Sequence, residues 1–376
     1  MEISLHIPEY LYDKVELLIE RIPYLSEVIT SMSYDEKNKV IIVSTKEIKP
    51  DVLPITEIKN HYSDLCKSLE NIRHIKQKIV KSNLDSEIKN IDIMACHQKK
   101  KDYMVEREIA LINQLDYVFI KIAQKYGAHL REYPSILNKN NMSLNKYHIN
   151  FPQNIYGITS VPHNYSKINE FRSKANSDSY QRLLESTGEF LQPCICYHCY
   201  EELQGNRLDE GKILTGRGKC FRHEIEWRKN KFRRNEFTMR EIVIFGEEKW
   251  VLNIRNQIME EVWSFFESLG LKGKIVTATD PFFFSQDVKT KGTYQMMSNA
   301  KFELIVNTTN SIESSIASFN YCQDMLCSKY DIKNQTETAL YSGCIAFGID
   351  RWKEAIIDYY GWEWQNWPKF NTKRGS

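Results

Sequence analysis

The chain has 376 residues, of which 42% are hydrophobic, and its 51 basic and 49 acidic residues leave a formal charge of +2. This composition can fill a sizeable core, and it excludes a disordered chain, a collagen-like fibre and a small disulfide scaffold. The near-neutral charge argues against a general nucleic-acid coat, although a local basic patch stays open. Because the chain has neither a membrane-length apolar run nor a signal-like start, we expect a soluble, cytoplasmic protein of about two domains.

The first 45 residues predict a small α/β unit. Ile3, Leu5 and Ile7 alternate with polar residues, as in a half-buried strand. Apolar residues within 11–22 then recur at helical spacing. Two further strands are expected within residues 28–44, on either side of a polar turn.

Residues 55–100 are polar, rich in lysine and free of glycine, which predicts helices with solvated faces or a linker. We therefore assign residues 1–100 to an N-terminal α/β extension of unknown role and residues 101–376 to a larger domain. The larger domain begins with an amphipathic helix at residues 106–126, whose apolar residues form one stripe. Gly127 suits the left-handed conformation that often ends a helix.

Beyond residue 150, strand-like runs alternate with turns, and one strong helix is expected at residues 253–269. The expected strands are residues 195–200, 219–224, 238–245, 274–278 and 302–307. Runs of strands with few helices predict an α+β fold, in which helices flank a mostly antiparallel sheet.

Nine cysteines are distributed unevenly, and in a reducing compartment they are more typical of metal ligands or buried thiols than of disulfides. Cys196 and Cys199 form a CxxC pair, and Cys194 lies two residues before it. A structural zinc knuckle would need a second pair at similar spacing, but Cys322 and Cys327 are five residues apart. Cys194 and Cys199 are therefore interpreted as small buried hydrophobic residues.

Three segments carry the strongest functional signal. The first is CFRHE at residues 220–224, followed by a strand-like run that ends at Gly246. The second is GCIAFGIDRW at residues 343–352, and the third is the helix ending at Tyr126 with the run through Pro134. These segments resemble motifs two, three and one of class II aminoacyl-tRNA synthetases, in the right order. An arginine and a glutamate two residues apart would, on their own, be interpreted as an ordinary exposed salt bridge. Three motifs in the order of the family favour the resemblance to class II synthetases instead.

This resemblance implies a site for ATP with Mg²⁺. Arg222 matches the arginine that holds the α-phosphate, and Glu224 matches the glutamate that reads the adenine amino group. Residues two apart on a strand face the same side, so both side chains could address one ligand. Phe237 resembles the aromatic residue that stacks under adenine, and Arg351 resembles the arginine that clamps the γ-phosphate.

Further segments narrow the resemblance to one branch. LQPCICYH at residues 191–198, DPFF at 280–283, KFEL at 301–304 and SFNYCQD at 318–324 closely resemble the amino acid:[carrier protein] ligases. Those enzymes are truncated relatives of the atypical, zinc-dependent seryl-tRNA synthetases of methanogenic archaea. The resemblance covers about residues 105–360 and leaves the first 100 residues uncovered.

The narrower resemblance implies one zinc ion per subunit, with Cys196, Glu241 and Cys344 as its protein ligands. An open fourth position is typical of a functional zinc, and in this family it takes the α-amino group of the substrate. Asn320 and Gln323 lie where the family lines the amino-acid pocket, although a polar strand end is an equal alternative.

The implied enzyme activates a small amino acid (glycine, alanine or serine) with ATP as an aminoacyl-adenylate. It then transfers the aminoacyl group to the phosphopantetheine thiol of an acidic holo-carrier protein. The alternative acceptor is tRNA, and a non-catalytic synthetase-like regulator is a third class, which would usually have lost a motif arginine or a zinc ligand. The resemblance also implies a homodimer formed through motif one. Lys289 and Lys291, within residues 285–300, are expected to help dock the carrier, with Gly292 interrupting any helix there.

Overall fold

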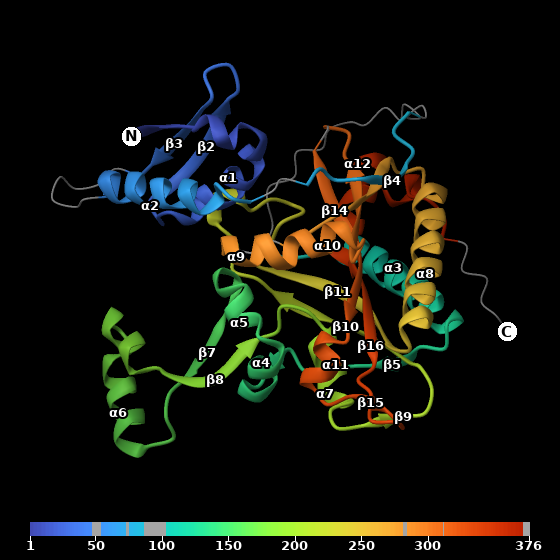
Figure 1. Cartoon of the computed structure of the whole chain (residues 1–376). Coiled ribbons are helices and arrows are strands. Elements are labelled where there is room, and N and C mark those ends of the chain that lie inside the picture. The colour runs from blue at the N-terminus through green and yellow to red at the C-terminus, as the bar shows by residue number, and fades with distance from the viewer. Residues whose placement is uncertain (47–53, 73–74, 86–102, 281–283, 311, 371–376) are drawn as a thin grey trace. The chain divides into compact units, whose positions relative to one another are not determined.

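The computed structural model describes residues 1–46, 54–72, 75–85, 103–280, 284–310 and 312–370. They divide into two compact units (Figure 1). The first unit comprises Met1–Gln77, Glu224–Lys229 and Thr279–Ser298, and the second comprises the remaining described residues. The division after Gln77 falls earlier in the chain than the predicted boundary at residue 100. Among the described helices, none combines the length and apolar character that crossing a bilayer requires.

The first unit contains a three-stranded antiparallel sheet with helices beside it. Its strands, in the order β1-β3-β2, are β1 (Glu2–His6), β2 (Ile29–Asp35) and β3 (Val40–Thr45). Its helices are a 3-10 turn at Glu9–Lys14, α1 (Val15–Arg21) and α2 (Pro54–Leu69). Ile3 and Leu5 are buried while their neighbours on β1 are exposed, which confirms the predicted alternation.

Two segments from much later in the chain complete this unit. In the segment Glu224–Lys229, Trp227 packs against the unit's apolar core. Arg228 donates hydrogen bonds to the carbonyl oxygens of Ile19 and Glu20, at 2.8 and 3.4 Å. The core of the first unit is therefore built from separate parts of the chain.

The second added segment is helical. It contains α9 (Ser285–Asp287), a π-helical turn at Val288–Gly292 and α10 (Thr293–Met297). Gly292 is buried and has helical backbone angles at the start of α10, so the prediction that it interrupts a helix was wrong.

The second unit is built on an eight-stranded sheet in the order β4-β12-β13-β14-β16-β11-β10-β5. Its strands are β4 (Ile79–Ser82), β5 (His129–Arg131), β10 (Lys212–Phe221), β11 (Glu236–Gly246), β12 (Gly273–Thr277), β13 (Lys301–Asn307), β14 (Glu313–Gln323) and β16 (Tyr341–Gly348). Within it β5 and β10 are parallel, and the other neighbouring pairs are antiparallel. The predicted antiparallel sheet is confirmed.

One face of this sheet is covered by long helices. These are α3 (Glu106–Lys125), α8 (Glu248–Ser268) and α12 (Ile349–Tyr360), which form the main core with β11, β14 and β16. Phe119 of α3 stacks on Phe347 of β16 with ring centroids 4.1 Å apart. The apolar stripe predicted for α3 is thus buried within this chain at Ile112, Phe119 and Ile122, whereas Ile109 is 49% exposed.

The opposite face is partly covered by short helices, namely α4 (Lys139–Asn145), α7 (Cys196–Glu202) and α11 (Met325–Lys329). The sequence predicted a strand at residues 195–200, and this prediction was wrong. Ile195, Cys199 and Leu203 recur every four residues, so a helix buries all three on one side.

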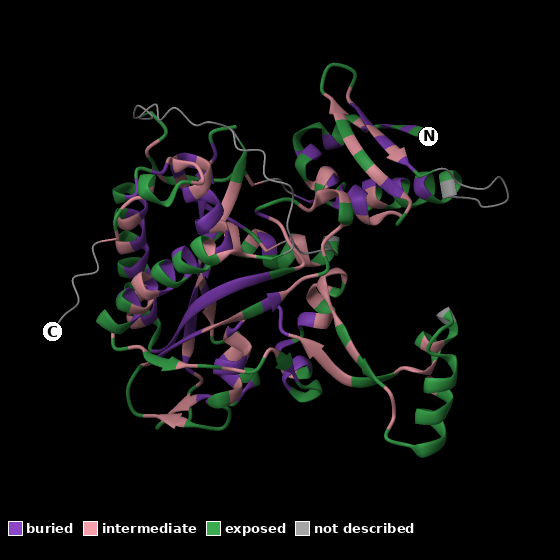
Figure 2. Cartoon of the chain, turned by 180° about the vertical axis from the view of Figure 1, so that it is seen from behind, coloured by how far each residue is buried: buried purple, intermediate pink, exposed green. Residues whose placement is uncertain are grey.

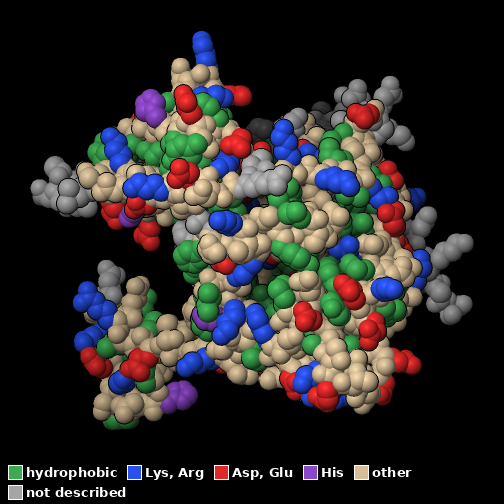
Figure 3. Space-filling view, in the orientation of Figure 1, with side chains coloured by type: hydrophobic (Ala, Val, Ile, Leu, Met, Phe, Trp, Pro, Cys, Tyr) green, Lys and Arg blue, Asp and Glu red, His purple; other side chains and the backbone are tan. Residues whose placement is uncertain are grey.

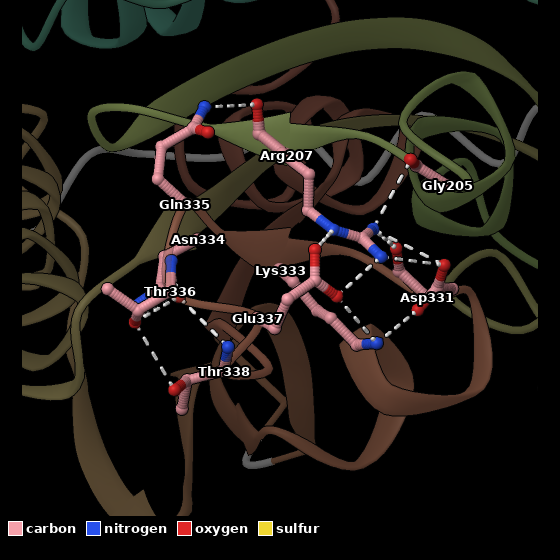
Figure 4. Close-up of polar contacts among 9 residues, drawn as sticks. All are labelled: Gly205, Arg207, Asp331, Lys333, Asn334, Gln335, Thr336, Glu337 and Thr338. Carbon is pink, nitrogen blue, oxygen red and sulfur yellow. Dashed lines mark hydrogen bonds and ion pairs between the residues drawn. The ribbon is translucent and has the colours of Figure 1, made fainter.

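A small parallel sheet of β9 (Arg207–Leu208) and β15 (Lys333–Asn334) lies next in sequence to α7 and α11. Ion pairs of Arg207 link the two strands at the surface. Its Nε lies 2.6 Å from the Glu337 carboxylate, and its Nη1 lies 3.3 Å from that of Asp331 (Figure 4). Lys333 pairs with the same two carboxylates.

An arm made of β6 (Ile136–Leu137), β7 (Gly157–Ser160) and β8 (Glu185–Leu191) includes the helices α5 (Tyr147–Asn150) and α6 (Tyr165–Lys174). Figure 2 contrasts α6, in which no residue is buried, with β11, which is buried along almost its whole length.

Candidate metal and nucleotide site

The sheet brings two of the predicted zinc ligands onto one face. Glu241 of β11 lies opposite Ala346 of β16, and Val243 lies opposite Cys344. Directly opposed residues share a face, and so do residues two apart on a strand. Glu241 and Cys344 are therefore diagonal neighbours on the face that also carries α7.

Helix α7 supplies the third predicted ligand. The carboxylate of Glu241 accepts a hydrogen bond from the backbone N–H of Cys196 at 2.5 Å. Two glycines of β10 allow this close approach. A Cβ at Gly216 would lie 3.0 Å from Ile195, and one at Gly218 would lie 2.9 Å from the same side chain. The glycines thus let the start of α7 rest directly on the sheet.

A fourth group joins this cluster. The ligand atoms of Cys194, Cys196 and Glu241 all lie within 4.8 Å of one another. The two sulfur atoms are 3.5 Å apart. Cys344 is not among the residues that meet this distance, although it lies on the same face of the sheet as Glu241. Cys194 is half-buried, and it lies in this cluster of polar groups rather than in an apolar core, which corrects its interpretation as a small buried hydrophobic residue.

The cluster holds several acidic groups out of water. Burial raises the pKa of the Glu241 carboxyl, although the backbone N–H of Cys196 and the charge of Arg222 act in the opposite direction. Burial likewise raises the pKa of the Cys194 thiol well above its usual range. Such groups favour their neutral forms until a cation compensates the charge. Two or more thiols with one carboxylate form a donor set that suits Zn²⁺, so the residues present fit the metal.

The predicted nucleotide-binding residues gather at one end of the same sheet. Phe237 lies opposite Cys220, and the backbone N–H of Arg222 continues the ladder to Asn235. The guanidinium of Arg222 lies 5.3 Å from the Phe237 ring centroid, and it donates to the carbonyl oxygen of Pro193 at 3.3 Å. An aromatic face and a cation are therefore presented side by side.

Arg351 lies at the start of α12, at this same end. Its guanidinium donates to the carbonyl oxygens of Phe232 and Ser315, at 2.8 and 2.7 Å. Gly348, which precedes α12, lies opposite Met239 on β11, two residues from Phe237. From Phe237 to Glu241 is four residues along β11, or roughly 13 Å. Arg222 reaches back toward the cysteine cluster, because it donates to the carbonyl oxygen of Pro193, the residue before Cys194.

Glu224 does not lie on the strand predicted for it. β10 ends at Phe221, and Glu224 belongs to the first unit. The argument that Arg222 and Glu224 face one side of a strand therefore fails. The role of Glu224 in reading adenine stays a prediction.

The two predicted substrate-binding residues, Asn320 and Gln323, lie at different positions relative to the cysteine cluster. Asn320 of β14 lies opposite Cys344 and donates to its carbonyl oxygen at 3.2 Å. Gln323 comes after an irregularity in the ladder, where it lies opposite Ser342 and has a positive φ of 51°. In the segment DPFF, residues 281–283 lie outside the described part of the chain.

Sequence reasoning missed a charged pair on this face. Lys301 of β13 lies opposite Asn320, and its Nζ is 3.1 Å from the carboxylate of Glu303. Lys301 is buried and Glu303 is not fully covered. The sequence does carry a sign of this pair: charged and apolar residues alternate in KFEL (residues 301–304), which places Lys301 and Glu303 on one face of the strand.

No family model matches the chain, but several curated proteins do. It is 25% identical over 269 residues to amino acid–[acyl-carrier-protein] ligase 1 of Bradyrhizobium diazoefficiens, covering 70% of this chain and 79% of the relative. It is 21% identical over 274 residues to the type-2 serine–tRNA ligase of Methanopyrus kandleri, covering 68% of this chain and 52% of the relative. The chain therefore matches only about half the length of that tRNA ligase.

Solved structures give a likeness of fold. The M. kandleri SerRS, in a crystal structure with A. aeolicus tRNASec, matches with a TM-score of 0.68 and 17% identity. That match covers 98% of this chain and 76% of the SerRS chain. It therefore extends beyond residues 105–360, to which the sequence resemblance was limited. The chain is a homologue of the amino acid–[acyl-carrier-protein] ligases and the type-2 serine–tRNA ligases, and it has a fold of the class II aminoacyl-tRNA synthetase type.

Proposed function

We propose that the protein is an AMP-forming amino acid:[carrier protein] ligase. The observation that supports this most directly is that Phe237, beside the Arg222 guanidinium, shares a strand and a face with Glu241, whose neighbours include Cys196 and Cys344. Arg351 begins the helix that follows β16 at this end of the sheet. The residues around Phe237 suit a nucleotide, and those around Glu241 suit a metal that binds an amine. The ligase relatives match over more of their own length than the tRNA ligases do.

In the first step, the carboxylate of a small amino acid attacks the α-phosphate of ATP, and pyrophosphate leaves. Such chemistry needs positioning and charge stabilisation more than a protein nucleophile. Phe237 supports the adenine ring, Arg222 turns from the Pro193 carbonyl to the α-phosphate, and Arg351 holds the γ-phosphate, with Mg²⁺ on the ATP. When bound by Cys196, Glu241 and Cys344, Zn²⁺ supplies a Lewis acid that orients the substrate amino group.

In the second step, an external thiol attacks the mixed anhydride and releases AMP. We assign that thiol to the phosphopantetheine arm of an acidic carrier protein. Lys289 and Lys291 are candidate contacts for it, although Lys291 already pairs with Asp287 at 2.8 Å. Basic and acidic side chains are interspersed over the face seen in Figure 3, which suits a limited docking patch better than a long polyanion.

ATP–pyrophosphate exchange, screened over the twenty amino acids, tests the first step. We expect exchange with one or a few small amino acids and loss of roughly a thousandfold in Arg351→Ala, because that charge stabilises the transition state. Arg207→Ala is the matched control, since Arg207 lies in the surface network of Figure 4. Absence of exchange with every amino acid would favour the non-catalytic regulator.

The tRNA-charging alternative is kept because the structural likeness to a tRNA-bound synthetase covers 98% of this chain. The acceptor decides between the two. Transfer of the activated amino acid to holo-carrier proteins supports the ligase, whereas charging of total tRNA with no transfer to any holo-carrier supports the alternative.

A further inference from the structure

Three polar residues of α12 form one stripe along the helix. Arg351, Glu354 and Asp358 are separated by three and then four residues, which puts their side chains on the same face over about two turns. Each contacts residues 230–235, which we call the return segment because they lead the chain into β11. The stripe therefore holds the stretch of chain that directly precedes the strand of Phe237.

Two of these contacts are ion pairs whose acidic partners are largely covered by protein. Oδ1 of Asp358 lies 2.6 Å from Nζ of Lys231, and the Asp358 side chain is only 5% exposed. Oε1 of Glu354 lies 3.5 Å from Nη2 of Arg234, and the Glu354 side chain is 11% exposed. Water and salt screen ion pairs at covered positions less than pairs on the open surface, so both pairs constrain the return segment.

The first and last residues of the stripe also hold the hairpin between β13 and β14. Nη1 of Arg351 donates to the carbonyl oxygen of Ser315 at 2.7 Å. Oδ2 of Asp358 accepts hydrogen bonds from the backbone N–H and the hydroxyl of Thr309, at 2.7 and 2.9 Å. Each end of the stripe therefore bridges the return segment to this hairpin, once through a cation and once through a carboxylate.

The bridge at Arg351 has a second task in the mechanism proposed above. Nε of Arg351 donates to the carbonyl oxygen of Phe232 at 2.8 Å, and the same guanidinium is proposed to hold the γ-phosphate. A guanidinium that turns to a phosphate must give up carbonyl acceptors. Asp358 has no proposed role at the phosphates, so its ion pair with Lys231 persists when ATP is bound. Nζ of Lys231 also lies 5.2 Å from the centroid of the Phe232 ring, which is buried in the main core.

We propose, on the basis of the nucleotide site proposed above, that Asp358 and Lys231 are positioning residues for ATP. Their ion pair keeps the return segment in place while Arg351 exchanges the Phe232 carbonyl for the γ-phosphate. ATP then binds beside a segment that is already ordered, and no binding free energy is lost in ordering it. Because the segment is equally ordered in the ground state and the transition state, the pair lowers KM for ATP and leaves kcat unchanged.

ATP–pyrophosphate exchange at varied ATP and saturating amino acid tests this role. In Asp358→Asn the amide oxygen can still accept the Thr309 N–H, but the charge that binds Lys231 is lost. We expect KM for ATP to rise roughly tenfold in Asp358→Asn and in Lys231→Met, with kcat and the KM for the amino acid within about twofold of the wild type. Lys231→Arg keeps a cation for Asp358 and should restore most of the affinity.

Lys274→Met is the matched control. Nζ of Lys274 lies 2.7 Å from Glu313, in a pair on the same sheet that does not include the return segment, so KM for ATP should not change. The double variant Asp358→Asn, Lys231→Met should raise KM for ATP no further than either single substitution, because the two residues act as one pair.

Two outcomes would overturn the role of the pair and leave the proposed ligase intact. One is an unchanged KM for ATP in both single variants, and the other is a fall in kcat and in the urea midpoint without a change in KM, which a merely structural role would produce. Calorimetric titration with ATP should give the same tenfold ratio as a Kd, and it needs no turnover. Absence of exchange in the wild type would therefore overturn the proposed function alone, whereas equal Kd values in the wild type and Asp358→Asn would overturn the positioning role.

Discussion

The carboxylate of Glu241 accepts the backbone N–H of Cys196, so a central strand of the sheet fixes the first residue of helix α7. This hydrogen bond directly joins two of the predicted zinc ligands. It orients the carboxylate of Glu241 toward the start of the helix. The site is therefore organised by the fold, and removing a ligand should cost metal binding more than folding.

Cys344→Ala should abolish zinc binding and amino-acid activation together, because the remaining groups give an incomplete donor set. Metal analysis of the purified variant and pyrophosphate exchange measure the two effects. Cys327→Ala is the control, since Cys327 is a buried thiol of α11 outside the metal cluster. Full zinc retention in Cys344→Ala would remove Cys344 from the ligand set.

Lys353 should be important for stability. It is fully buried, and its Nζ lies 2.6 Å from Glu108 and 2.7 Å from Glu354, so it links α3 to α12. Lys353→Met leaves two carboxylates without this cation and should lower the free energy of unfolding by about 3–5 kcal/mol. Urea titration measures the change.

Lys333→Met provides the comparison, because Lys333 also bridges two carboxylates but does so on the surface (Figure 4). Its urea midpoint should hardly change, since exposed ion pairs contribute little. Equal effects of the two substitutions would contradict the importance of burial here.

The protein should be a homodimer, although the structure removes one argument for it. Most of the α3 stripe is already covered by this chain, but Ile109 of α3 and Leu130 of the edge strand β5 are 49% and 46% exposed. Light scattering should give about twice the 44.4 kDa chain mass.

The double variant Ile109→Glu, Leu130→Glu should shift the particle to the mass of one chain. Ile168→Glu should not, although Ile168 is 48% exposed on α6. A wild type that has the mass of one chain at micromolar concentration would exclude the dimer.

Reversing the charges of Lys289 and Lys291 should slow transfer to the carrier and leave pyrophosphate exchange unchanged. Surface charges at the rim of an interface act mainly on association. Rates of thiol transfer at low and high salt measure the effect, which should be largest at low salt. If transfer is unaffected at both salt concentrations, the carrier docks elsewhere.

The sequence predicted the central elements of the fold because their patterns are strong. The helix at 106–126, the strand at 238–245 and the helix at 253–269 all match observed elements within a few residues. Each is long enough for its period to be unambiguous. Helix α7 was read as a strand because a short apolar run does not distinguish the two periods.

The sequence predicted which residues form the candidate site better than it predicted how they are arranged in space. Cys196, Glu241 and Cys344 are far apart in sequence, and only the ladder between β11 and β16 shows that two of them are neighbours. Cys194 was interpreted as a small buried hydrophobic residue, because two cysteines separated by one residue do not by themselves indicate a shared site. Glu224 was misplaced because nothing local shows that the strand stops at Phe221.

The packing of Trp227 and Arg228 also bears on how this protein can be cut or recombined. The first unit takes its core from three separate stretches of chain, two of which interrupt the second unit's sequence. A fragment ending at Gln77 would lack Trp227, and the carbonyl oxygens of Ile19 and Glu20 would lose the Arg228 guanidinium. The unit is therefore not a portable module: neither excision of residues 1–77 nor their transfer to another protein would carry an intact fold with it.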